Sequence, residues 1–124
     1  MSDSRKQLGN QGESLALTHL EELGMKLVCR NYRWRGGEID LIMSDGSVLV
    51  FVEVRCKSVA THGSPLETID YKKRRQIEKC ARQYLAHKKV SADICCRFDA
   101  VGVLLPANGK ARIQYIPDAF RVGE

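Results

Sequence analysis

The sequence lacks the features that mark membrane, secreted and zinc-binding proteins. Its longest uninterrupted apolar run covers only residues 48–52, whereas a membrane-spanning helix needs about 20 residues. No apolar stretch follows the polar N-terminus (residues 1–6), so no secretory signal is visible. None of the five cysteines is spaced C-x-x-C, and Cys95 and Cys96 are adjacent, so neither a zinc cluster nor a disulfide framework is indicated. We therefore expect a reduced, cytoplasmic setting and no membrane association.

The composition is that of an ordinary globular protein. The chain has 124 residues, of which 44% are hydrophobic and 28% are charged, and no linker, repeat or low-complexity stretch divides it. This predicts one domain over residues 1–124. The 20 Lys and Arg exceed the 15 Asp and Glu by five. This surplus hints at an anionic partner, but its size alone is weak support.

Apolar spacing and turn residues predict a helix followed by three strands. The helix is expected over about residues 7–23, with Gly24 as its C-cap. Its apolar stripe consists of Leu8, Ala16, Leu20 and Leu23. The strands are expected over residues 26–34, 38–43 and 48–55. Asp45-Gly46 is the expected hairpin turn between the second and third strands.

A second helix and two more strands complete the prediction. The helix has two candidate N-caps, because Ser64 and Glu67 have capping-box spacing around a proline and Asp70 follows a turn later. The last strands are expected over residues 95–105 and 112–116, with a hairpin at Asn108-Gly109 and an end before Pro117. Because a helix separates strand 48–55 from strand 95–105, these two strands can lie parallel through a crossover. The predicted fold is therefore α/β, a mixed sheet flanked by helices.

Acidic residues interrupt the apolar pattern of the sheet at two places. Glu53 and Arg55 break it on one face of the third strand, and Glu38 and Asp40 break it on the second. A turn centred between residues 45 and 46 places Asp40 within one or two positions of Glu53. Two carboxylates so placed repel each other unless a cation lies between them, and oxygen ligands suit Mg²⁺ or Mn²⁺. The alternative is an ion-pair network with Arg55.

Glu13 supplies a third carboxylate. It lies on the apolar stripe of the first helix, so its side chain is expected to face inward. It either joins the other acids or pairs with one of the many arginines.

The positive charge is concentrated in one helix. Residues 72–89 contain eight Lys and Arg against Glu78 alone, a net +7, so the rest of the chain is slightly acidic. With the apolar residues of this helix facing inward, its cations form a candidate phosphate-binding face. The proposed contacts are Lys72, Lys73, Arg74, Arg75, Lys79 and Arg82. The alternative is an ordinary solvated helix surface.

A second basic cluster is interleaved with aromatic residues. Alternation puts Arg30, Tyr32 and Trp34 on one face of the first strand and places Arg33 and Arg35 on the other. Arg33 and Arg35 are further candidate nucleic-acid contacts. Trp34 either stacks on bases or belongs to the core.

These segments resemble known families. Asp40 followed by Glu53-Val54-Arg55 resembles the D-(x)n-E-x-K motif of restriction-endonuclease-like nucleases. The surrounding segments closely resemble the YraN-like family of uncharacterised bacterial proteins over nearly the whole chain. These segments are Gly9-Asn10-Gln11-Gly12-Glu13, Gly37-Glu38-Ile39-Asp40-Leu41-Ile42, Leu49-Val50-Phe51-Val52-Glu53-Val54-Arg55 and Arg97-Phe98-Asp99-Ala100-Val101. That family is similar in turn to archaeal Holliday junction resolvases.

The resemblance implies a restriction-endonuclease-like fold and a Mg²⁺- or Mn²⁺-dependent nuclease. Glu13, Asp40 and Glu53 would be its metal ligands, and Arg55 would be its fourth catalytic residue. Arg55 stands where the motif has Lys, and an arginine cannot act as a general base, although it can hold a phosphate. Lys57 and Glu38 are candidate auxiliary residues.

The same resemblance implies partners. DNA, in particular branched DNA, is expected more than RNA, and a homodimer is expected by analogy with the junction-cutting relatives. Two alternatives remain open. The chain is either a nucleic-acid-binding module that kept the nuclease fold without hydrolysis, or an interaction domain for an acidic protein.

Overall fold

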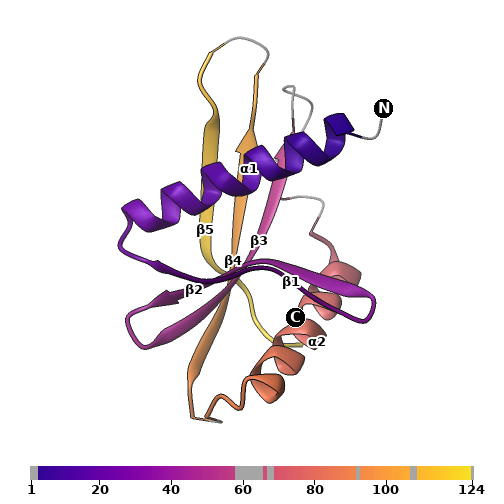
Figure 1. The fold of residues 1–124 in the computed structure, drawn as a ribbon, viewed down its shortest axis with the longest axis vertical. Helices are drawn as coiled ribbons and strands as arrows, with labels where there is room; N and C mark the ends of the chain where they lie inside the picture. The colour runs from indigo at the N-terminus through magenta and orange to yellow at the C-terminus, as the bar shows by residue number, and fades with distance from the viewer. Residues whose placement is uncertain (1–2, 58–65, 67–68, 92, 107–108, 124) are drawn as a thin grey trace.

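The computed structural model describes residues 3–57, 66, 69–91, 93–106 and 109–123. Its elements, in chain order, are α1 (Asp3–Glu22), β1 (Lys26–Trp34), β2 (Gly37–Asp45), β3 (Val48–Lys57), α2 (Tyr71–His87), β4 (Cys95–Leu104) and β5 (Arg112–Phe120). The strands form one sheet in the order β1-β2-β3-β4-β5, in which β3 and β4 are parallel and the other neighbours are antiparallel (Figure 1). This confirms the predicted α/β fold with its crossover through α2.

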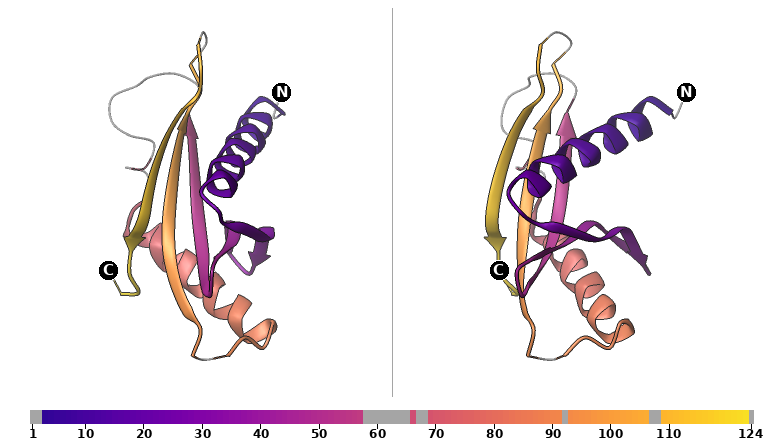
Figure 2. Two further views of the ribbon diagram at one scale, coloured as in Figure 1. Left: turned by 90° about the vertical axis from the view of Figure 1, so that its left-hand side faces the viewer. Right: turned by 60° about the vertical axis from the view of Figure 1, so that its left-hand side comes forward.

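The two helices cover opposite faces of the sheet (Figure 2). Because side chains alternate along β3, Val50 and Val52 pack under α1 against Ala16 and Leu20. Phe51 points to the other face, under α2. β3 is therefore apolar on both sides, as expected of a doubly covered strand.

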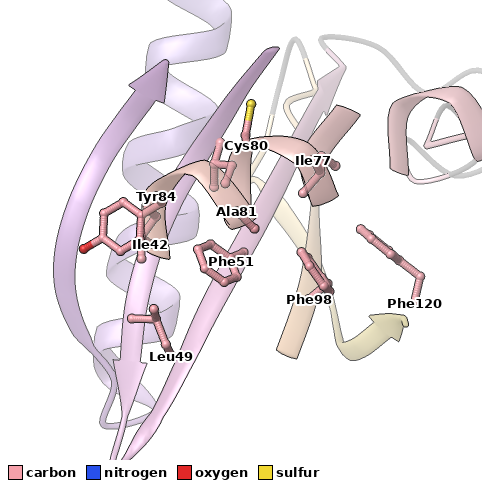
Figure 3. Packing of buried hydrophobic residues seen from close by; sticks show 10 residues of the cluster. Ile42, Leu49, Phe51, Ile77, Cys80, Ala81, Tyr84, Phe98 and Phe120 are labelled. Carbon is pink, nitrogen blue, oxygen red and sulfur yellow. The ribbon is translucent and has the colours of Figure 1, made fainter. Parts of the chain in front are cut away.

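The core under α2 is built around aromatic residues (Figure 3). The rings of Phe51 and Phe98 stack with centroids 5.6 Å apart, and those of Phe98 and Phe120 stack at 5.0 Å. The helix contributes side chains at i, i+3, i+4 and i+7 spacing, which places them on one face. These are Ile77, Cys80, Ala81 and Tyr84. Each large apolar side chain buried here contributes about 1.5–3 kcal/mol.

The helix ends agree only partly with the sequence prediction. α2 begins after Asp70, whose side chain accepts a hydrogen bond of 2.9 Å from the Lys73 N–H; the capping box at Ser64 and Glu67 lies outside the described residues. α1 ends at Glu22, and Gly24 with φ +98° follows it as the predicted glycine of the C-terminal turn. The prediction that Leu23 is buried is wrong, because its side chain is 54% exposed. The chain reverses at Gly24, and Met25 takes the core position instead.

Two predictions about the strands need correction. The β2–β3 turn is Gly46-Ser47 rather than Asp45-Gly46, because Asp45 pairs directly with Val48. β5 continues beyond Pro117 to Phe120. Proline is tolerated there because β5 is an edge strand, where a missing N–H leaves no ladder bond unmade on the open side. Among the described residues, no helix is long and apolar enough to cross a membrane.

Candidate metal centre

Two glycines bring the helices close to the sheet beside the acidic residues. A Cβ on Gly12 of α1 would lie 2.7 Å from the Cβ of Cys56, and a Cβ on Gly37 of β2 would lie 2.6 Å from the Sγ of Cys80 in α2. Real Cβ atoms do not approach this closely, so only glycine permits this packing. The residues that follow these glycines are Glu13 and Glu38. Close packing of the backbone therefore fixes the position of both carboxylates.

The observed register aligns Asp40 with Glu53. Leu41 pairs with Val52, so the same register carried one position further sets Asp40 opposite Glu53 on the neighbouring strand. The one-residue correction of the turn thus strengthens the predicted juxtaposition. Beyond Leu41 the ladder ends, and the Val54 N–H donates to Asp40 Oδ2 at 2.8 Å. This bond holds the Asp40 side chain against β3.

Three carboxylates converge from α1 and β2. Glu13, Glu38 and Asp40 each have an oxygen within 4.8 Å of the others. In Figure 1, β1 and β2 run across the direction of β3–β5, below α1 in this view. Glu38, predicted only as an auxiliary residue, is thus placed with Glu13 and Asp40.

Asn31 links two of these acids, which the sequence analysis did not predict. With its amide nitrogen turned toward them, Asn31 donates to Glu13 Oε1 at 3.0 Å and to Glu38 Oε1 at 3.1 Å. Its φ of +53° is a conformation that asparagine tolerates better than most residues. Arg30 also reaches Glu13 Oε1, at 3.7 Å, so the predicted arginine pairing and the acidic cluster occur together. No pattern in the sequence pointed to Asn31.

Glu53 is the most deeply buried acid of the site. Its side chain is 3% exposed and lies against the Asp40 carboxyl, from the α2 side of the sheet. Its Oε2 faces Arg55 at 3.2 Å and Lys73 at 3.4 Å, whereas no donor from the described residues reaches Oε1. Burial and the Asp40 carboxylate raise the pKa of Glu53 from 4.5 to about 8, although Lys73 and Arg55 act in the opposite direction.

The pKa of Glu13 is shifted by the same two causes as the pKa of Glu53. Burial and the neighbouring Asp40 carboxylate raise the pKa of Glu13, and the Arg30 guanidinium offsets part of that rise. Four carboxylates therefore form one continuous cluster, in which the ionised forms of Glu13 and Glu53 are unfavourable. A divalent cation relieves such repulsion, and an oxygen-only donor set suits Mg²⁺ or Mn²⁺.

The predicted basic residues fall into two groups. Lys73 and Arg75 of α2 and Arg33 of β1 are paired with acids: Lys73 with Glu53, Arg75 with Glu78 at 4.0 Å, and Arg33 with Glu38 at 2.9 Å. The others point to solvent or into cavities. Lys72, Lys79, Arg82 and Arg35 are exposed, and Arg74 is half-buried with no partner for its Nε among the described residues. Lys57 lies at the end of β3. The basic face is thus partly used to balance the acidic cluster.

Asp99 is another buried acid, and its hydrogen bonds stabilise the fold. Asp99 on β4 is fully buried and accepts hydrogen bonds from Arg97 Nε at 3.0 Å, from the Tyr115 hydroxyl and from the Asp118 N–H at 2.8 Å. Every oxygen therefore has a donor, in contrast to Glu53 Oε1. This satisfied network ties β4 to β5 across a register shift.

Comparisons with known proteins match the sequence of this chain to a family. The family model described as "Uncharacterised protein family UPF0102" matches residues 12–103, a range that contains all four carboxylates. A UPF0102 protein of Geobacter metallireducens is 42% identical over 122 residues, which cover 98% of each chain. A UPF0102 protein of Chlorobium chlorochromatii is 44% identical over 125 residues, which cover 97% of this chain and 95% of the relative.

Proposed function

Because the chain belongs to the uncharacterised protein family UPF0102, the YraN-like proteins that its sequence resembles, we propose its function from the site itself: a divalent-metal-dependent nuclease that hydrolyses phosphodiesters in DNA. The observation that carries this proposal is Glu53. A buried carboxylate with one oxygen unpartnered, pressed against a second carboxylate, is costly to the fold and is explained by a ligand.

The residues present fit a hard divalent cation. Asp40 and Glu53 would hold it, with Glu13 and Glu38 completing the oxygen donor set. Such a cation polarises a phosphoryl oxygen and lowers the pKa of bound water. Asn31 orients Glu13 and Glu38, and the Val54 N–H orients Asp40.

Arg55 and Lys73 are two cationic side chains that could bind the phosphate. Arg55 points one nitrogen at Glu53, and its Nε has no partner among the described residues. Lys73 contacts Glu53 from the first turn of α2. With a cation held by the carboxylates, Arg55 and Lys73 would be free to bind a scissile phosphate and to stabilise its developing negative charge. Arg55 holds the phosphate and does not act as a base, because it stays protonated.

A cleavage assay tests the proposal. Linear, single-stranded and four-way-junction DNA are incubated with the protein, with Mg²⁺ or Mn²⁺ or with a chelator. We expect metal-dependent products that Asp40→Ala and Glu53→Ala abolish, whereas Glu22→Ala, an exposed acid of α1, retains full cleavage. Products that persist in both site variants would show that the nuclease site lies elsewhere or that a contaminant acts.

A second candidate function is supported by the ion pairs. Arg55 and Lys73 neutralise Glu53 without a metal, which suits a nucleic-acid-binding module that has lost hydrolysis. This candidate predicts salt-sensitive DNA binding with no products at any metal concentration. Arg55→Lys, which restores the lysine of the nuclease motif, separates the two candidates. In a module that has lost hydrolysis, the substitution would create cleavage that the wild-type chain lacks, whereas an active enzyme would cleave DNA both with and without it.

A further inference from the structure

A groove lies outside the acidic cluster, between the end of β1 and the exposed side of α2. Its volume is about 620 Å³, within the about 300–1,000 Å³ typical of ligand sites. Its lining residues are Trp34, Arg35, Lys79, Arg82, Gln83 and Ala86. Those from α2 have i, i+3, i+4 and i+7 spacing and so form one stripe along the helix. The lining combines three cations with one aromatic ring and contains no acid.

The β1–β2 hairpin and its packing on α2 fix the position of Trp34 in this groove. Trp34 pairs with Gly37 across the β1–β2 hairpin, and Gly37 packs directly on Cys80 of α2. Trp34 and Tyr32 are both half-buried at the margin of the core, and Tyr32 packs edge-on against Tyr84 with centroids 5.1 Å apart. The hairpin and its packing on α2 therefore hold the half-buried Trp34 in the lining of the groove.

The three cations of the groove are available to a ligand. In the part of the chain that the structure describes, no acid pairs with Arg35, Lys79 or Arg82, in contrast to Arg33 and Lys73. Like charges gathered around one groove repel each other, and an anion relieves this repulsion.

We propose that this groove binds one unpaired nucleotide of a nucleic-acid strand, with its base on Trp34 and its phosphates on Arg35, Lys79 and Arg82. The inference rests on the proposed function in that both require nucleic acid as the partner. A duplex keeps its bases stacked on each other, so only a base that has left the stack presents a face to the indole. The groove thus favours single-stranded or branched substrates over a closed duplex.

The distance between the groove and the acidic cluster allows a single nucleic-acid strand to contact both. Lys73 contacts Glu53, and at a rise of about 1.5 Å per residue Lys79 and Arg82 lie about 9 and 14 Å further along α2. That is a few nucleotides at the about 3.4 Å rise of a stacked strand. A strand held at the cluster can therefore place a neighbouring unpaired base in the groove.

Trp34 is the only tryptophan in the chain, so its fluorescence reports on the groove directly. The full chain is titrated in chelator with an oligothymidylate of about ten nucleotides, within the about 4–16 nucleotides that single-strand sites occupy. Three comparison probes are an abasic oligomer of the same length, a blunt duplex and polyglutamate. We expect saturable quenching with oligothymidylate and little quenching with the other three.

Variants separate stacking from charge. Trp34→Leu keeps an apolar side chain at the margin of the core, and we expect it to weaken binding of labelled oligothymidylate about 5- to 150-fold while binding of the abasic oligomer is unchanged. Trp34→Phe, which keeps a ring, should recover part of the loss. Arg35→Ala with Arg82→Ala should weaken both probes. The matched control, Lys110→Ala with Arg112→Ala, removes the same charge from exposed positions beside β5.

The outcomes distinguish this inference from the proposed function. Oligothymidylate that binds without quenching, or binds Trp34→Leu as tightly as the wild-type chain, would overturn the groove assignment even where metal-dependent cleavage is found. The same holds if oligothymidylate does not bind. Equal quenching by polyglutamate would make the groove a surface for acidic peptides and also overturn it. If the expected quenching is found but no DNA is cleaved, the proposal that the groove binds a nucleotide stands and the proposal that the protein hydrolyses DNA is refuted. Thermal melts of each variant verify that it is folded.

Discussion

Replacing Glu53 with glutamine should stabilise the protein, and the size of the effect should depend on pH. The side chain is 3% exposed, and burial beside Asp40 raises its pKa from 4.5 to about 8. Between these two values the unfolded chain releases the proton while the folded chain keeps it. The folded state therefore binds more protons, so its stability falls as the pH rises through this window. Glutamine has a similar shape and no such cost.

The magnitude follows from the two pKa values. At pH 7 the retained proton costs the wild-type fold about 3 kcal/mol, and above pH 8 the ionised carboxylate costs about 5 kcal/mol. Against a typical stability of about 5–15 kcal/mol these are large effects. We therefore expect Glu53→Gln to match the wild-type chain near pH 4.5 and to exceed it by about 3 kcal/mol at pH 7.

Urea denaturation in chelator, at several values between about pH 5 and about pH 8, measures this difference. Glu22→Gln, an exposed acid on α1, is the matched control and should show no pH-dependent gain. A loss of stability in Glu53→Gln at neutral pH would refute the reasoning. It would mean that the pairs with Arg55 and Lys73 outweigh desolvation and that the acidic cluster is a structural ion-pair network.

Three further predictions follow from other contacts. Mn²⁺ at about 100 times its dissociation constant should stabilise the wild-type chain by about 2.7 kcal/mol in thermal melts, and Asp40→Asn should lose most of this gain. An equal gain in the variant would show that the metal does not bind at Asp40. Gly12→Ala should cost about 1–3 kcal/mol in urea titrations because its Cβ would meet Cys56 at 2.7 Å, whereas Gly9→Ala, which meets nothing within 4 Å, should not destabilise; equal stabilities would contradict the close packing of α1. Asp99→Asn should cost about 1–3 kcal/mol because it disturbs three buried hydrogen bonds, yet leave Mn²⁺ binding unchanged in calorimetry.

The sequence predicted the elements well because their signals are local. The order of helices and strands and the parallel pairing of β3 with β4 are confirmed. α1 spans Asp3–Glu22 rather than about residues 7–23, with Gly24 just after its end, and Asp70, one of the two predicted N-caps, caps α2. Where local signals competed, the prediction failed. Asp45-Gly46 has the preferred turn composition, yet Gly46 and Ser47 form the turn. The alignment of the two sheet faces across the hairpin decides the register, not the turn residues alone.

The candidate site was predictable in part for a related reason. Carboxylates that interrupt an apolar strand or lie on the apolar stripe of a helix are visible in the pattern, and so Asp40 and Glu53 on the strands and Glu13 on the helix were identified. Lys73 carried no such signal, because a cation on a basic helix looks the same whether it faces solvent or a buried acid. Its pairing with Glu53 depends on where the first turn of α2 meets the end of β3.

By itself, the sequence determined which residues are candidates for functional chemistry: the acids on two neighbouring strands and the helix, the cations on α2, and the single tryptophan beside arginines. Only the tertiary structure decided how they are grouped. Backbone contacts at Gly12 and Gly37 and the twist of β1 and β2 place Glu38 and Asn31 beside Glu13, and set Trp34 above the cations of α2. Residue type and spacing are fixed along the chain, whereas burial, register and twist arise only when distant segments pack together.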